Sequence, residues 1–168
     1  AAQNNHVSAF LRPINDTLQT IPLFVFLIPV LMFFRVGEFT AFLAIIMYAV
    51  LPPIRYTEHG LRSVDAEVVE AATAIGCTRR QTLWQVKLPL ALPEIMLGLN
   101  QTIMFGLAML VITALVGTKG LGQSIYIALG KADPGAGIVA GLSMALIAMI
   151  ADRIIQAWSN KKKAAFGL

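Results

Sequence analysis

A glycine-rich segment is the first place in the chain where residue types and spacing could do chemistry. Residues 117–124 read Gly-Thr-Lys-Gly-Leu-Gly-Gln-Ser, which is close to the G-x4-G-K-S/T pattern that holds nucleotide phosphates. Gln123 stands where that pattern requires its lysine, and the segment follows a long apolar run instead of a β-strand. We therefore expect no nucleotide site here, but a turn followed by a short helix over Ser124–Leu129.

Other catalytic and metal-ligating side chains are sparse. The chain of 168 residues has two histidines and a single cysteine, Cys77, so it can form neither an internal disulfide nor a thiolate metal cluster. His6 and His59 lie far apart in the sequence, and no grouping of serine, histidine and carboxylate indicates hydrolysis. We expect no catalytic, metal or cofactor site on this chain, so any nucleotide chemistry must belong to a partner protein.

The composition indicates a membrane protein. Hydrophobic residues make up 57% of the chain and charged residues 13%, about half of the ~25% usual in soluble domains. This balance excludes most soluble enzymes and argues against nucleic-acid binding, despite the net charge of +4. Apolar runs bounded by charged residues predict an all-α protein with four transmembrane helices, at residues 17–35, 38–54, 95–118 and 134–152.

The positive charges set the orientation. Of the 13 lysines and arginines, only Arg35, Lys119 and Lys131 fall between the first and second spans or between the third and fourth. The other ten lie in residues 55–94 or in the terminal segments. Because lysine and arginine concentrate on the cytoplasmic side of membrane proteins, we expect residues 55–94 and both termini to be cytoplasmic.

The third span carries polar side chains that need partners inside a membrane. Asn100, Gln101 and Thr113 would lack hydrogen bonds if they faced lipid. They are therefore expected to face other helices or to line a watery translocation path, and the sequence leaves both interpretations open. Small residues that would allow close helix packing also recur every fourth position, at Gly98, Thr102 and Gly106 and at Gly137, Gly141 and Ala145.

The 40 residues from 55 to 94 are long for a connector and predict two short helices. Ser63 and Asp65 are candidate N-caps for the first helix, and Gly76 is placed to end it in a left-handed conformation. Thr78 and Gln81 have capping-box spacing, so a second helix should begin there. Taken alone, the pattern is also typical of an amphipathic pair that lies on the membrane surface.

Prolines are expected to mark helix ends on both sides of this loop, because proline removes a backbone hydrogen bond. Pro52 and Pro53 are predicted to end the second span at the cytoplasmic surface. Pro89 and Pro93 are predicted to end the second loop helix before the third span. Within the first span, Pro22 and Pro29 are expected to permit bending.

The loop also matches a known pattern. It reads Glu70-Ala71-Ala72, three residues, Gly76, nine residues, Val86, one residue and Leu88-Pro89. This resembles the EAA loop of ABC importer permeases, E-A-A-x3-G-x9-I-x-L-P, and departs from it only where Val86 replaces isoleucine. The resemblance implies the helical bundle of a type I ABC importer permease.

Shorter motifs extend the resemblance to the permease subunits of glycine betaine and proline transport systems. They are residues 19–22 (Gln-Thr-Ile-Pro), 51–55 (Leu-Pro-Pro-Ile-Arg), 100–102 (Asn-Gln-Thr), 120–123 (Gly-Leu-Gly-Gln) and 152–153 (Asp-Arg). The implied function is uptake of glycine betaine, proline or a related quaternary-amine osmolyte, with choline and carnitine as alternatives. Five aromatic residues could also form a cage for a quaternary ammonium, although packing is the preferred interpretation: Phe24, Phe26, Phe33, Phe34 and Tyr48.

The resemblance also implies partners in a bacterial inner membrane. Such permeases work as dimers, here a homodimer in lipid, with two cytoplasmic ATPase subunits that hold ATP and magnesium and with a substrate-binding protein outside. Glu70, Ala71, Ala72 and Gly76 would form a coupling helix that docks in the ATPase. Val86, Leu88 and Pro89 would join the loop to the third span.

The family core has five spans with the loop between the third and fourth, whereas only two spans precede it here. We therefore expect residues 1–168 to be a single transmembrane domain that is the C-terminal portion of a longer subunit. Two other classes are considered: an ATPase-independent carrier or channel, and a membrane scaffold. A carrier should have a charged side chain in the middle of a span, and none of the four runs contains one.

Overall fold

The computed structural model describes residues 5–166, which form helices and their connections. The first half of this segment contains α1 (Asn5–Thr20), α2 (Leu23–Phe34), α3 (Glu38–Ala49), α4 (Leu51–Arg62) and α5 (Ala66–Ala74). The second half contains α6 (Arg79–Gln81), the π-helix η1 (Thr82–Lys87), α7 (Leu88–Leu90), α8 (Leu92–Thr113), the 3₁₀ helix η2 (Ala114–Val116), α9 (Leu121–Gly130) and α10 (Pro134–Phe166).

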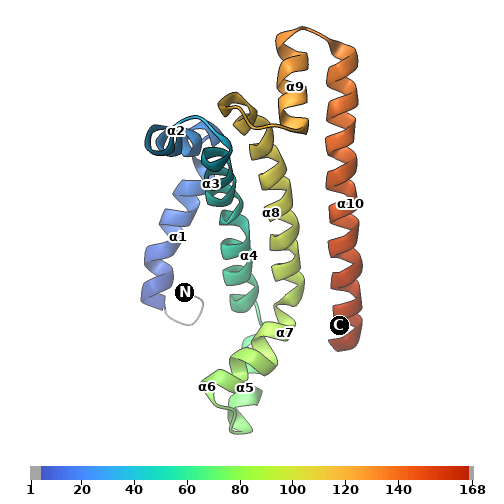
Figure 1. Ribbon diagram of the computed structural model, residues 1–168. Coiled ribbons are helices and arrows are strands. Elements are labelled where there is room, and N and C mark those ends of the chain that lie inside the picture. Colours follow the sequence, from blue (N-terminus) through green and yellow to red (C-terminus); the bar gives the residue numbers. More distant parts are fainter. Residues whose placement is uncertain (1–4, 167–168) are drawn as a thin grey trace.

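The long helices run side by side, and the short ones gather at the two ends of the bundle (Figure 1). α8 lies against α3, α4 and α10, and α1 contacts α4. α5 and α6 project beyond one end of the bundle, whereas α9 packs beside α10 at the opposite end. The beginning of α1 and the end of α10 lie at the same end as α5 and α6.

Three helical segments are long and apolar enough to cross a membrane, among the residues described: Glu38–Arg62, Leu92–Val116 and Pro134–Lys161. The predicted first span, residues 17–35, is wrong as a single helix, because the chain breaks between α1 and α2. Pro22 is the N-cap of α2 with extended backbone angles (φ −58°, ψ 145°). A residue that precedes proline is biased away from the helical conformation, so the bend expected at Pro22 is a full break. Pro29, in contrast, lies inside α2.

The predicted end of the second span is also wrong. Pro52 and Pro53 lie in the first turn of α4, where a missing amide costs no intrahelical hydrogen bond. α4 follows α3 after the single residue Val50, so the two form one helical segment, Glu38–Arg62, that includes residues 55–62. The fourth span begins at Pro134 as predicted, but α10 continues well past Asp152, because charged residues end the apolar run without ending the helix.

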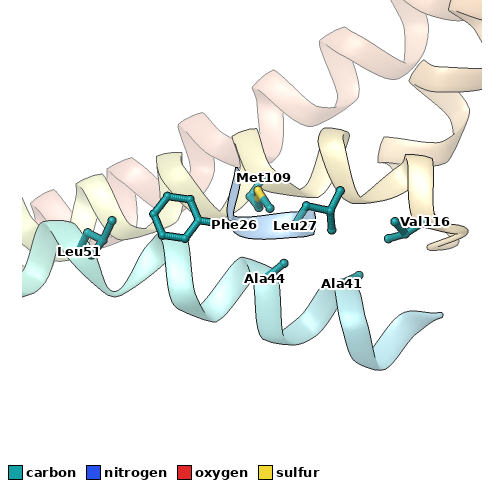
Figure 2. Close-up of a cluster of buried hydrophobic side chains, with 7 residues drawn as sticks. All are labelled: Phe26, Leu27, Ala41, Ala44, Leu51, Met109 and Val116. Atoms are coloured by element: carbon teal, nitrogen blue, oxygen red, sulfur yellow. The ribbon is translucent and has the colours of Figure 1, made fainter. Parts of the chain in front are cut away.

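The core lies where α2, α3 and α8 meet, and Figure 2 shows its side chains. Ala41 and Ala44 are almost fully enclosed, and their small side chains let α3 approach Met109 of α8, which is 0% exposed. The other members are Phe26, Leu27, Leu51 and Val116. Large apolar side chains elsewhere are exposed, including Met32 and Phe33 on α2, which is the surface expected of a helix that faces lipid or another membrane protein.

α4 and α8 pack closely through a glycine from each helix. A Cβ atom added at Gly98 would lie 2.8 Å from the Cβ of Tyr56, and one added at Gly60 would lie 2.7 Å from the Cβ of Glu94. The packing role expected for Gly98 is therefore confirmed. A Cβ on Gly106 would make only an ordinary contact, and one on Gly141 would have no neighbour within 4 Å.

The glycine-rich segment forms a turn, as predicted. Gly117 and Gly120 have φ of +84° and +114°, which only glycine adopts without strain, and the short helix expected after them is α9. A Cβ on Gly122 would lie 2.5 Å from the carbonyl oxygen of Leu110. This glycine therefore lets α9 lie directly against the backbone of α8.

Candidate functional site

The loop between α4 and α8 begins with a well-capped helix. The Asp65 carboxylate accepts a hydrogen bond from the amide of Glu67 at 3.1 Å, and α5 follows. At its end, the amide of Cys77 donates to the Ala72 carbonyl and the amide of Gly76 donates to the Thr73 carbonyl. These two bonds form a Schellman motif with Gly76 at φ +94°. Of the two candidate caps, Asp65 is confirmed, whereas Ser63 is wrong because it is the C-cap of α4. The glycine stop at Gly76 is confirmed.

The second part of the loop begins at the predicted capping box. The Thr78 amide donates to the Gln81 side-chain oxygen at 2.9 Å, and the Gln81 amide donates to the Thr78 hydroxyl at 3.4 Å. The helix then widens into the π-helix η1 before α7 and α8. The prediction that Pro89 and Pro93 end this helix is wrong, because both lie in first turns, of α7 and α8.

We expect Thr78→Val to loosen the start of this helix. Valine keeps the shape of threonine but removes the hydroxyl that accepts from Gln81, and loss of an N-cap costs about 1 kcal/mol. Amide hydrogen exchange at Gln81 in the intact subunit should become about fivefold faster. Thr78→Ser keeps the hydroxyl and should exchange at the original rate. Equal exchange in the valine and serine variants would contradict the capping role.

The loop exposes part of its Glu-Ala-Ala motif and two large apolar side chains. Glu70 and Ala71 are exposed on α5, whereas Ala72 is buried. Ile75 at the bend is 84% exposed and Trp84 on η1 is 60% exposed. An apolar surface of this kind at the tip of a projecting helix pair is typical of a protein contact.

The other motif residues of the loop lie closer to the bundle. Val86, Leu88 and Pro89 are half-buried, α5 packs against η1, and α7 contacts α4. The loop is therefore fastened to α4 and α8 at its base. The loop carries no group of histidine, cysteine and acidic residues that could hold a metal ion, and neither does the rest of the described chain.

The polar residues of α8 have different surroundings. Gln101 lines a cavity of about 340 Å³. Asn100 is half-buried, and its side-chain oxygen is enclosed with no hydrogen-bond partner. Thr113 is 0% exposed and its hydroxyl donates to the Leu110 carbonyl of its own helix at 3.0 Å. Its surroundings are those of a residue packed between helices. The structure therefore brings Gln101 to a cavity, and a pathway role for Asn100 and Thr113 stays a prediction.

Sequence reasoning missed the residues that face Gln101 across this cavity. α4 supplies Arg55, Tyr56 and His59, and Phe105 of α8 completes the aromatic part of the wall. Residues 55–59 fall in the predicted loop because the charge of Arg55 is expected to end the second span. Their spacing of three and four residues, one helical face, was the signal that could have placed them on a helix.

A second cavity, of about 290 Å³, adjoins the first. Both are lined by Arg55 and His59, and the second is also lined by Asn15, Asp16 and Glu58. Arg55 lies 3.4 Å from the Asp16 carboxylate of α1, and Glu58 pairs with Arg62 at 3.2 Å. Asp16 and Glu58 therefore line the cavity on the α1 side of Arg55, while the described residues that line the cavity on the α8 side include no carboxylate.

The arrangement of these helices defines the class of fold. The structure superposes with a TM-score of 0.78 on a chain of the inward-facing MetNI methionine ABC transporter, over 92% of this chain and 76% of that one, at 22% sequence identity. The fold is that of a type I ABC transporter permease. Residues 1–163 match the family model described as "Binding-protein-dependent transport system inner membrane component", and the chain belongs to that family.

Several permease subunits for methylated amines are similar to this chain. GbuB, a glycine betaine/carnitine transport permease protein of Listeria monocytogenes, is 42% identical over 97% of this chain and 58% of its own length. TmoV, a trimethylamine N-oxide transport system permease protein of Pelagibacter ubique, is 45% identical over 99% of this chain and 23% of its own length. ProW, a glycine betaine/proline betaine transport system permease protein of Escherichia coli, is 39% identical over 93% of this chain and 44% of its own length. The chain thus spans less than two thirds of each of these relatives.

Proposed function

We propose that this chain is the transmembrane domain of a subunit that imports glycine betaine or a related methylated amine, driven by ATP hydrolysis on a partner. The observation that carries the proposal is the bent helix pair α5–α6, which projects from a bundle whose relatives are named as permeases for such amines. ATP and magnesium bind the partner ATPase. This chain contributes the path through the membrane and the α5–α6 surface that the moving ATPase contacts.

The proposed coupling uses the exposed tip and the fixed base of the loop. Glu70 and Ala71 dock in a cleft of the ATPase, with Ala72 buried on the inner side of α5 and Gly76 fixing the bend that presents the helix. Val86, Leu88 and Pro89 transmit the movement, because they lie where the loop joins α4 and α8. Closure of two ATPase subunits would then tilt these helices and alternate access to the path.

The proposed topology keeps four passes through the inner membrane. α1 and α2 together make the first crossing, and the three long apolar segments make the others. Arg79, Arg80 and Arg153 lie toward the α5–α6 end, while Lys119 and Lys131 lie in the connections at the opposite end. This distribution supports a cytoplasmic α5–α6 end, with both ends of the segment on that side. A second copy and an external binding protein complete the assembly in lipid.

Transport by the whole complex tests the proposal. The full-length permease, its ATPase and its binding protein are reconstituted in liposomes, and uptake of labelled glycine betaine is measured with and without internal ATP. We expect uptake that requires ATP and the binding protein and that survives ionophores. Uptake without ATP that collapses when an ion gradient is dissipated would instead identify a gradient-driven carrier.

A further inference from the structure

The cavity between α4 and α8 combines hydrogen-bond donors and aromatic rings in one wall. Its lining includes Arg55, Tyr56 and His59 from α4 and Gln101 and Phe105 from α8. Its volume of about 340 Å³ is at the lower end of the range of small-molecule sites. This cavity therefore has the size for a compact solute.

Close packing fixes the positions of the aromatic side chains. The Cβ of Tyr56 lies directly over Gly98, where an added Cβ would be only 2.8 Å away. Gln101 and Phe105 follow Gly98 by three and seven residues and so share its helix face. The ring of Phe105 stacks on that of Tyr48 with centroids 4.9 Å apart. The aromatic part of the wall is consequently packed within the bundle, whereas the Arg55 side chain at its edge is 55% exposed.

The charges around the cavity are unevenly distributed. Arg55 carries a positive charge at its edge and is held from the α1 side by Asp16 at 3.4 Å. The carboxylates of Asp16 and Glu58 line the neighbouring cavity, and no acidic residue is among the described residues that line this one. The Arg55 guanidinium and the Gln101 amide give this lining N–H groups of the kind that bind an anionic oxygen.

We propose that this cavity is a transit site for a small zwitterion that carries a methylated quaternary nitrogen and an anionic oxygen. The oxygen is received by Arg55 and Gln101, and the methylated nitrogen lies against Tyr56 and Phe105, since aromatic faces attract such cations. Glycine betaine, carnitine and trimethylamine N-oxide, named for the relatives, share this chemistry. The inference rests on the proposed function and adds the residues that select the cargo.

The site lies in the half of the bundle next to the loop. Arg55 precedes the end of α4 by seven residues and Gln101 follows the start of α8 by nine, which correspond to about 10 and 14 Å along the helices. Movement of α4 and α8 by the loop would change this cavity directly. Each ATPase cycle would therefore change the surroundings of a substrate bound in it.

The experiment measures, in the reconstituted full-length complex, glycine betaine imported and ATP hydrolysed in the same liposomes. Arg55→Gln and Tyr56→Leu should each lower the betaine imported per ATP by about tenfold, the effect of losing one interaction with a charged group. Lys161→Gln, at an exposed position of α10, is the matched control for removal of a positive charge and should retain the original ratio.

Each outcome decides the matter. An unchanged ratio in both Arg55→Gln and Tyr56→Leu would overturn the transit site. Import and ATP hydrolysis that fall together would also overturn it, because that result means lost assembly and not lost cargo binding. If the unsubstituted complex imports no methylated amine with ATP, the proposed function itself fails.

Discussion

Replacing Gly76 by valine is expected to reduce ATP-driven uptake by about tenfold or more. Gly76 has φ +94°, and a Cβ added there would have no neighbour within 4 Å. The cost is therefore conformational: a side chain in this left-handed region costs about 1–3 kcal/mol, and β-branched residues fit it worst. That strain would unwind the Schellman motif and move Glu70 and Ala71 away from the partner.

Asparagine at the same position separates the bend from other effects of substitution. Asn tolerates the left-handed conformation, and its side chain would occupy the same open space. Gly76→Asn should therefore retain most of the uptake in proteoliposomes, with equal amounts of both variants in the membrane. If valine transports as well as asparagine, the bend at Gly76 does not carry the coupling.

Replacing Gly122 by alanine is expected to have the largest effect on stability. The added Cβ would lie 2.5 Å from the Leu110 carbonyl oxygen and 3.4 Å from the Cα of Val111. Both are backbone atoms of α8, so neither can move aside as a flexible side chain would. Overpacking costs about 1–3 kcal/mol, and we expect the upper part of that range. The measurement is the thermal unfolding midpoint of the detergent-solubilised full-length subunit.

Gly130 is the matched control, because it lies at the other end of the same helix and an added Cβ would have no neighbour within 4 Å. Gly130→Ala should leave the unfolding midpoint unchanged or raise it slightly, since alanine favours helix more than glycine by about 1 kcal/mol. Equal midpoints for the two alanine variants would show that α9 does not lie against the α8 backbone at Gly122.

The sequence predicted the loop well because its ends are decided locally. The capping bonds between Thr78 and Gln81 and the positive φ of Gly76 depend on side chains within a few residues of one another. The same holds for the turn at Gly117 and Gly120. Such features follow from residue type and spacing before any tertiary packing is known.

Helix limits were predicted less well, for two physical reasons. Proline is expected to end a helix, but Pro52 and Pro89 lie in first turns, where the missing amide is tolerated. Charge is expected to end a span, but Arg55 and Asp152 continue their helices. A membrane limits where apolar residues lie, whereas backbone hydrogen bonds extend a helix beyond that limit.

The α4–α8 cavity could not be predicted, because it depends on which faces meet. Gln101 is recognisable as a polar residue in need of a partner, and its spacing places Phe105 on the same face of α8, but nothing local indicates that Tyr56 of α4 lines the same cavity. Thr113 has the same polar character, and its hydroxyl bonds within its own helix. Only the packing of Gly98 against Tyr56 distinguishes the two positions.

The central claim is that the α5–α6 tip contacts the ATPase, and photo-cross-linking tests it most directly. A photoreactive phenylalanine is placed at Ile75, or at Leu129 as the control, in the full-length permease assembled with its partners. Both side chains are large, apolar and exposed, at 84% and 78%. Ile75 directly follows α5 and Leu129 belongs to α9, and these two helices lie at opposite ends of the bundle (Figure 1). We predict that the probe at Ile75 labels the ATPase and the probe at Leu129 does not. An ATPase labelled from Leu129 and not from Ile75, in an assembled and active complex, would contradict the account.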